Sequence, residues 1–404
     1  MPVSRRRLGV IFLTVLIDLI GFGIILPILP YYAQRFGVQG VGFGTLVFAF
    51  SAMQFLATAL LGWLSDRVGR RPIILTTTIF NAAGYLLFAF AGSYPILLVA
   101  RLISGFAGGN ISAAQAYIAD ITPAAERSKG MGMLGAAFGL GFTLGPAVGG
   151  LAAHYGGSAA PGLVAAGLSL LNFVSAYFIL PESLGLEHRS QRELWDFGHV
   201  GEAFDSPRLR PLMVVWGLAP FAFSGYTVAL PLFAGAAFGW RERELGLFFA
   251  VVGLTAAVVQ GFLFGKLARR VGDRALVILG MFGMALAIGV VPFLPSGQAL
   301  YGWTFVLAFS NSVFAPAATG LVSVYASPTE QGSILGAAQS VAALGRMGGP
   351  LAVGWAYDAL GNRTAFLAAG AVMLIAGLVS LRLERVSPAM ATGPASDAGH
   401  RPSG

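Results

Sequence analysis

The sequence predicts an all-α integral membrane protein with 12 transmembrane helices in two six-helix bundles related by pseudo-two-fold symmetry. Three observations predict this fold class. Of the 404 residues, 56% are hydrophobic and only 10% are charged, whereas soluble domains average about 45–50% and about 25%. Twelve apolar runs are long enough to cross a bilayer. The two halves of the chain also share a sequence repeat. This composition excludes a soluble enzyme and a nucleic-acid-binding domain.

The twelve runs occupy most of the chain. Each holds about 20 mostly apolar residues, the length that spans a hydrocarbon core. Glycine contributes 56 residues, about twice its usual share of roughly 7%, which is typical of closely packed membrane helices. In chain order, the predicted spans are residues 8–31, 42–64, 72–92, 95–119, 130–153, 160–180, 209–233, 245–266, 275–294, 298–326, 332–357 and 363–382.

The basic residues predict the orientation. With alternating loops, 19 of the 25 Lys and Arg residues lie on one side and four on the other, while Arg101 and Arg346 lie inside spans. Because cytoplasmic loops carry the excess of Lys and Arg, we expect both termini in the cytoplasm. The net charge of +8 is therefore attributed to orientation in a membrane and not to nucleic-acid binding.

A polar break divides the chain into two halves. We expect an N-terminal bundle (residues 1–181), a cytoplasmic central loop (182–208), a C-terminal bundle (209–385) and a disordered cytoplasmic tail (386–404). Residues of the first half recur in the second at an offset of 203 or 204. Because each half holds an even number of spans, the copies share one orientation, which places a transport site between the halves. The recurring pairs are Glu126/Glu330, Leu140/Leu344, Gly141/Gly345, Gly145/Gly349, Pro146/Pro350, Gly150/Gly354, Gly62/Gly265, Leu64/Leu267, Arg67/Arg270, Val68/Val271, Gly69/Gly272 and Arg71/Arg274.

Searches for catalytic and cofactor motifs give negative results. The sequence has no G-x-x-x-x-G-K-[ST] phosphate loop, no G-x-S-x-G elbow, no cysteine, and no metal-ligand spacing among its four histidines. We therefore expect no enzymatic activity, no cofactor, no ATP site and no metal. Transport would be driven by an ion gradient or by the solute's own gradient.

The loop between the second and third spans, GWLSDRVGRR (residues 62–71), is the most specific signal. Gly62 allows close helix approach, and Asp66 can pair with a cation or a helix N-terminus. The loop resembles the signature loop of the major facilitator superfamily, and the match is complete. The resemblance implies that the loop latches the cytoplasmic ends of the two halves, with Asp66 as its key. In the second half, Arg269 takes the place of Asp66, so that copy cannot form the same latch.

We assign a cytoplasmic gate to this loop and to the cytoplasmic end of the fourth span. Asp120 and Arg127 are expected to form a charge relay with Asp66 and Arg70, and the alternative is a polar helix cap. For the loop itself, the alternative is an anchor at the cytoplasmic surface. The gate residues are Gly62, Asp66, Arg67, Gly69, Arg70, Arg71, Asp120 and Arg127.

Small residues spaced four apart mark the fifth span. This spacing lets a second helix pack closely, and Pro146 adds a kink or hinge. The alternative is a tightly packed helix without a special role. The pattern G-x-x-x-G-P-x-x-G-G resembles the fifth-span motif of drug/proton antiporters in the superfamily, which implies export. The residues of this antiport helix are Gly141, Gly145, Pro146, Gly149 and Gly150.

Asp18 is the only acid in the first span. It lies about 15 Å from the start of the run at a rise of about 1.5 Å per residue, near the centre of the hydrocarbon core. A carboxylate there is costly and predicts a function, which we take to be proton coupling. Arg101 lies at a similar depth and is expected to modulate Asp18; the alternative is a purely structural ion pair between the two. The segment Asp18–Pro30 resembles the first span of tetracycline/proton antiporters.

Polar residues inside other spans are candidates for a substrate cavity. Arg346 could attract an anionic or chelated substrate group, or it could reach to the outer interface or pair with a carbonyl. Each uncharged residue could instead form an interhelical hydrogen bond. The candidates are Gln54, Asn81, Asn110, Gln115, Asn311, Gln339 and Arg346.

Over nearly the whole chain, the sequence resembles twelve-span drug/proton antiporters, and the nearest subgroup resembles the tetracycline exporters. Those exporters carry acids in the third and ninth spans, where this chain offers Asn81 and no acid. The resemblance implies a bacterial inner-membrane protein, functional as a monomer, that exports a small amphipathic molecule in exchange for protons. A metabolite exporter, an uptake carrier, a transport-inactive receptor or scaffold, and a lipid-modifying enzyme remain alternatives. The fifth-span motif argues against uptake.

Overall fold

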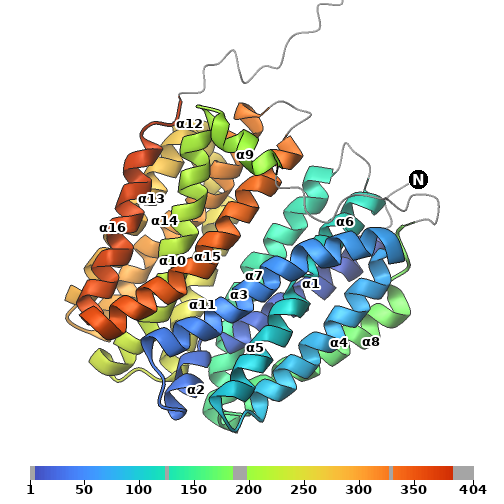
Figure 1. Cartoon of the computed structure of the whole chain (residues 1–404), viewed down its shortest axis with the longest axis horizontal. Helices are drawn as coiled ribbons and strands as arrows, with labels where there is room; N and C mark the ends of the chain where they lie inside the picture. The colour runs from blue at the N-terminus through green and yellow to red at the C-terminus, as the bar shows by residue number, and fades with distance from the viewer. Residues whose placement is uncertain (1–4, 123–126, 185–197, 327–330, 385–404) are drawn as a thin grey trace, which may run out of the picture.

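The computed structural model describes residues 5–122, 127–184, 198–326 and 331–384, and these fold into two helical bundles that lie side by side (Figure 1). The first bundle contains α1 (Arg5–Ile25), α2 (Leu29–Arg35), α3 (Gly40–Val68), α4 (Arg70–Ala89), α5 (Tyr94–Gly108), α6 (Ile111–Ile121), α7 (Arg127–Gly156) and α8 (Ala160–Ile179). The second contains α10 (Leu209–Phe238), α11 (Glu242–Val258), η3 (Val259–Leu263), α12 (Phe264–Val271), α13 (Asp273–Val290), η4 (Val291–Phe293), α14 (Gly297–Tyr325), α15 (Gln331–Leu360) and α16 (Asn362–Ser380). The short helix α9 (Gly198–Asp205) lies in the expected central loop.

The prediction of twelve membrane-spanning helices is confirmed. Ten helical stretches in the described part of the chain are long and apolar enough to cross a membrane. Helices α7 and α15, with 30 residues each, complete the twelve. Both are rich in glycine and contain a proline, and both pack against the opposite bundle.

Two of the predicted spans are interrupted by short breaks in the helix. The run 8–31 breaks after Ile25 and resumes at Leu29, because Pro27 and Pro30 lack the amide hydrogen that a continuous helix needs. The run 95–119 breaks between Gly108 and Ile111, where the backbone of Gly109 lies directly against Ala57 of α3. The expected tail, residues 386–404, lies outside the described residues.

The internal repeat is visible in the backbone. The described residues include six glycines with positive φ, a conformation that side chains disfavour. They form three pairs at nearly the repeat offset: Gly37 with Gly239, Gly69 with Gly272, and Gly157 with Gly361. Each pair ends or links corresponding helices in the two bundles, so the same chain reversals occur twice.

The bundles meet at one end of the molecule through the same contact made twice. We call this the far end, and the opposite end, which carries Arg67, Arg70 and Arg71, the arginine-rich end. A side chain on Gly44 (α3) would meet the carbonyl of Pro350 (α15). A side chain on Gly246 (α11) would likewise meet the carbonyl of Pro146 (α7), at 2.7 Å. Glycine therefore lets the two bundles touch backbone to backbone at the far end.

Hydrogen bonds add to this closure. The backbone N–H of Val41 donates to Asp358 Oδ2 (2.7 Å), so a carboxylate of the second bundle caps the N-terminus of α3. The hydroxyl of Tyr31 donates to the carbonyl oxygen of Trp240 (3.0 Å). Within the described residues, no hydrogen bond or ion pair joins the bundles at the arginine-rich end, where they lie apart (Figure 1). The structure is closed at the far end and open at the other.

Replacing Asp358 by alanine should favour opening of the far end. Loss of a helix cap costs about 1 kcal/mol, which corresponds to about a fivefold shift in the closed-to-open equilibrium. Because the chain has no cysteine, a single Ser51→Cys reporter can be labelled without background; Ser51 on α3 lines a small cavity between the two bundles. We expect an impermeant maleimide to label it about fivefold faster from the far side in Asp358→Ala. The matched control is Glu384→Ala at the arginine-rich end, and an equal rate in both variants would contradict the capping role.

Candidate functional site

A carboxyl group in the first bundle is held by asparagine amides. Asn110 Nδ2 donates to Asp18 Oδ2 (2.6 Å), and Asn172 Nδ2 donates to Asp18 Oδ1 (3.3 Å). The amide of Asn81 is a third hydrogen-bond neighbour of this carboxyl. Asp18 on α1 is therefore surrounded by amides from α4, from the break between α5 and α6, and from α8.

The break in the predicted fourth span places one of these amides. Asn110 lies between α5 and α6, and its side chain reaches Asp18 because Gly109 packs closely on α3. Asn81 and Asn110 are among the predicted cavity residues, and the structure places both beside Asp18. Our sequence analysis missed Asn172, although it is the only amide side chain in the sixth apolar run and that signal could have been used.

Arg101 does not pair with Asp18. Its guanidinium lies over the ring of Phe50, 4.3 Å from the ring centroid, and its Nε has no hydrogen-bond partner. The residue is only 4% exposed. The structural ion pair that was the alternative is absent, because amides bond to the carboxylate oxygens and Arg101 on α5 faces α3.

Arg101 instead lines a cavity between the two bundles. The cavity has a volume of about 80 Å³, and its polar wall includes Arg101, Gln54 and, from the second bundle, Arg346. Gln54 Nε2 donates to the carbonyl oxygen of Gly108 (3.2 Å). Two predicted cavity residues, Gln54 and Arg346, thus lie in its wall. The other three predicted cavity residues are not part of this wall: Gln115, Asn311 and Gln339.

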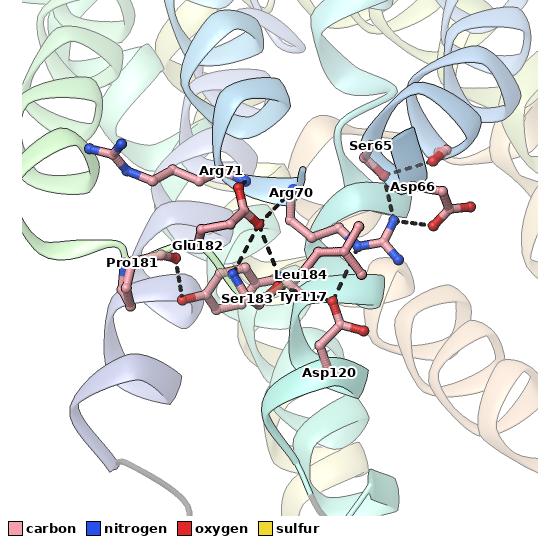
Figure 2. A network of polar contacts seen from close by, with 11 residues as sticks. Ser65, Asp66, Arg70, Arg71, Tyr117, Asp120, Pro181, Glu182, Ser183 and Leu184 are labelled. Carbon is pink, nitrogen blue, oxygen red and sulfur yellow. Dashed lines mark hydrogen bonds and ion pairs between the residues drawn. The ribbon is translucent and has the colours of Figure 1, made fainter. Parts of the chain in front are cut away.

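Four of the predicted gate residues lie in one cluster at the arginine-rich end of the first bundle (Figure 2): Asp66, Arg70, Arg71 and Asp120. The guanidinium of Arg70 contacts Asp66 (2.5 Å) and Asp120 (3.2 Å) and donates to Ser65 Oγ (2.6 Å). The structure therefore brings together Asp66, Arg70 and Asp120 as expected. The side chain of Arg127 lies outside the described residues. In this open state, every described contact of the cluster stays within the first bundle.

Glu182 is the member of this cluster that sequence analysis missed. Its carboxylate accepts hydrogen bonds from the backbone N–H groups of Arg70 (2.9 Å), Arg71 (3.2 Å), Ser183 (2.9 Å) and Leu184 (3.1 Å). The first turn of α4 carries two arginines and no acid, an unfavourable charge at the positive end of a helix dipole. Glu182 supplies the missing negative charge from the segment that follows α8 (Figure 2).

The second bundle repeats this arrangement with different charges. Arg71 Nη2 donates to the carbonyl of Tyr177 at the end of α8 (2.7 Å), and Arg274 Nη2 donates to the carbonyl of Leu381 just after α16 (2.9 Å). Helix α13 begins with its own acid, Asp273, where α4 begins with Arg70. The second copy therefore needs no equivalent of Glu182.

The glycine-rich helix α7 packs closely on two sides. Side chains on Gly141, Gly145 or Gly149 would meet α1 at Leu19, Ile20 or Ile24. A side chain on Gly150 would meet the carbonyl of Glu242 in α11, at 3.1 Å. The predicted antiport helix thus joins α1, which carries Asp18, to the opposite bundle, and Pro146 lies inside this continuous helix.

Among the described residues, no group of three or more His, Asp or Glu side chains could hold a metal ion.

A pair of glycine substitutions should isolate the contribution of Glu182. Gly69→Ala and Gly272→Ala both place a side chain at positive φ, which costs about 1–3 kcal/mol. Only Gly69→Ala would also displace the Glu182 carboxylate, because Gly272 has open space around it. We expect Gly69→Ala to be destabilised by about a further 0.5–1 kcal/mol, the value of an exposed helix cap. Thermal unfolding of the purified variants measures the difference.

The Glu182→Ala background supplies the control. In that background the two glycine substitutions should cost the same, because no carboxylate remains to be displaced. A persistent difference would show that Gly69 is needed for another reason.

The family model of the Major Facilitator Superfamily matches residues 11–263 and 212–403. Human major facilitator superfamily domain-containing protein 10 is 31% identical over 90% of both chains, and the Escherichia coli class C tetracycline resistance protein is 30% identical over 96% of this chain and 100% of that one. The crystal structure of the human organic anion transporter MFSD10 (TETRAN) covers 94% of this chain and 100% of its own at 29% identity, with a TM-score of 0.70. The chain belongs to the major facilitator superfamily of membrane transporters.

Proposed function

We propose that this protein exports small amphipathic molecules in exchange for protons by alternating access. The observation that carries the proposal is the position of Asp18, a carboxyl in the middle of a membrane-spanning helix that is held by amides. Within the described residues it has no cationic partner. A structural charge inside a membrane would be expected to have one.

The amide environment suits a group that gains and loses a proton. Burial favours the neutral carboxyl, and amide N–H donors favour the carboxylate, so the two effects oppose each other. A permanent ion pair with Arg101 would fix the charged form, and the structure does not contain that pair. Asp18 is therefore proposed as the proton carrier.

The direction of transport follows from the orientation of the chain. We propose that the arginine-rich end faces the cytoplasm, so that the open state accepts substrate from inside the cell. The bundles would then close through the cluster of Asp66, Arg70 and Asp120 and separate at the far end. The fifth-span motif in α7, which resembles that of drug/proton antiporters, supports export over uptake.

Relatives suggest the range of substrates. One relative is a tetracycline resistance protein and another is described as an organic anion transporter. We propose a bacterial inner-membrane exporter that functions as a monomer. It is not an enzyme, and it uses the proton gradient in place of ATP or any cofactor.

Asp18→Asn should abolish drug-driven proton movement. In everted vesicles with an acidified interior, adding a transported drug from a panel that includes tetracycline should release protons and collapse the pH gradient. The variant cannot carry the proton, so its signal should fall to that of vesicles without the protein. Fluorescence of a pH-sensitive dye reports the collapse.

Glu384→Gln, at an exposed acid that pairs with Arg208 (2.9 Å), is the matched control and should keep the wild-type response. An inserted and folded Asp18→Asn protein that still exchanged drug for protons would refute the role of Asp18. If the folded wild type responds to no drug, the metabolite exporter becomes the better hypothesis.

A further inference from the structure

The cavity between the bundles contains two arginines and no acid. Arg101 enters it from α5 of the first bundle and Arg346 from α15 of the second. None of the described residues in the cavity wall is acidic, and the remaining wall is mostly apolar. The structure gives neither guanidinium an ion pair or a hydrogen bond with another described residue.

For Arg101, which is only 4% exposed, this arrangement is costly when no ligand is bound. A buried charge without a partner loses its hydration and gains nothing in exchange. The Phe50 ring offsets part of this cost for Arg101 through a cation–π contact. Arg346 is exposed within the cavity and so remains available to a ligand. The neighbouring carboxylate of Asp18 does not neutralise either cation, because its oxygens bond to the amides.

We propose that Arg101 and Arg346 together bind the acid group of an organic anion. This inference rests on the proposed export function and specifies its substrate class. A guanidinium binds a carboxylate or sulfonate by paired charge-assisted hydrogen bonds. Arg101 is thereby assigned to substrate binding and not to the modulation of Asp18.

The volume of the cavity fits the acid group of a ligand and not a whole drug-sized molecule. Sites for whole drug-sized molecules usually measure about 300–1,000 Å³, and this cavity measures about 80 Å³. It can enclose one acid group while the apolar body of the ligand extends toward the open, arginine-rich end. Phe22, Leu26 and Val47 supply apolar walls beside the arginines.

The two arginines also make binding depend on conformation. Because one comes from each bundle, an anion between them joins α5 to α15. The cavity persists while α3 and α15 remain in contact at the far end. Separation of the bundles there would move Arg346 away from Arg101, which dismantles the site and releases the anion.

The test compares two probes of the same shape and different charge. Wild-type protein in lipid nanodiscs is equilibrated at neutral pH with 1-naphthaleneacetate or with the neutral 1-naphthaleneacetamide, and binding to empty discs is subtracted. We expect the acid to bind at least about tenfold more tightly than the amide, since hydrogen bonds between charged groups are worth about 1.5–3 kcal/mol. Arg346→Gln and Arg101→Gln should each remove this preference, whereas Arg363→Gln, on the exposed start of α16, should keep it.

Equal binding of acid and amide, no saturable binding of the acid at millimolar concentration, or a preference that survives both cavity variants would overturn the proposal. If Arg101→Gln does not fold, Arg346→Gln alone decides, because its side chain is exposed in the cavity. Asp18→Asn should still prefer the acid, because binding needs no proton gradient. A failure of proton coupling with intact acid preference would therefore refute the proposed function alone.

Discussion

A charged side chain inside a hydrocarbon core must find its partners within the protein. In this chain, three such side chains differ in the partners that they find. Asp18 is bonded by amides from three neighbouring segments. Among the described residues, Arg101 contacts an aromatic ring but no anion, and Arg346 contacts neither. The satisfied charge is the one that can be neutralised by a proton, and the unsatisfied charges line the cavity between the bundles. Under the proposed function, this unequal compensation would assign proton transfer to Asp18 and ligand binding to the two arginines.

Glycines form the surfaces through which the two bundles touch and through which they can separate. At the far end, α3 meets α15 and α7 meets α11 through glycine, so the backbones touch without interlocking side chains. Contacts of this kind can separate without the repacking of large side chains. Within the first bundle, by contrast, the cluster around Arg70 and Glu182 ties α3, α4, α6 and the segment after α8 together. We infer that the bundles move as units because the cluster of ion pairs lies inside one bundle, whereas glycine contacts and two hydrogen bonds join the bundles at the far end.

Most of the fold could be predicted from the sequence, but only part of the candidate site could. Hydropathy, basic loops and the repeat predict the spans and the two halves because each depends on composition along the chain. The cluster of Asp66, Arg70 and Asp120 was also predictable, since helix ends place these residues at one surface. Arg101 was predicted to lie inside a span and is buried in the protein, but the rise per residue does not say which neighbour a side chain faces. Asn110 reaches Asp18 only because the helix breaks at Gly109, and that break depends on tertiary packing against α3.

The repeat shows how one backbone plan carries two different sets of charges. Gly145 packs on the carbonyl of Ile20, and Gly349 packs on the carbonyl of Phe221, which makes Ala219 the counterpart of Asp18. The second bundle therefore reproduces the helix contact without a carboxyl group at this position. The second bundle has Arg346 instead. At the repeat offset, the counterpart of Arg346 in the first bundle is Phe142. The shared backbone gives two equivalent contacts at the far end, so both can open in one movement. Because the charges are not shared, that movement separates Arg346 from Arg101 while Asp18 stays within its own bundle.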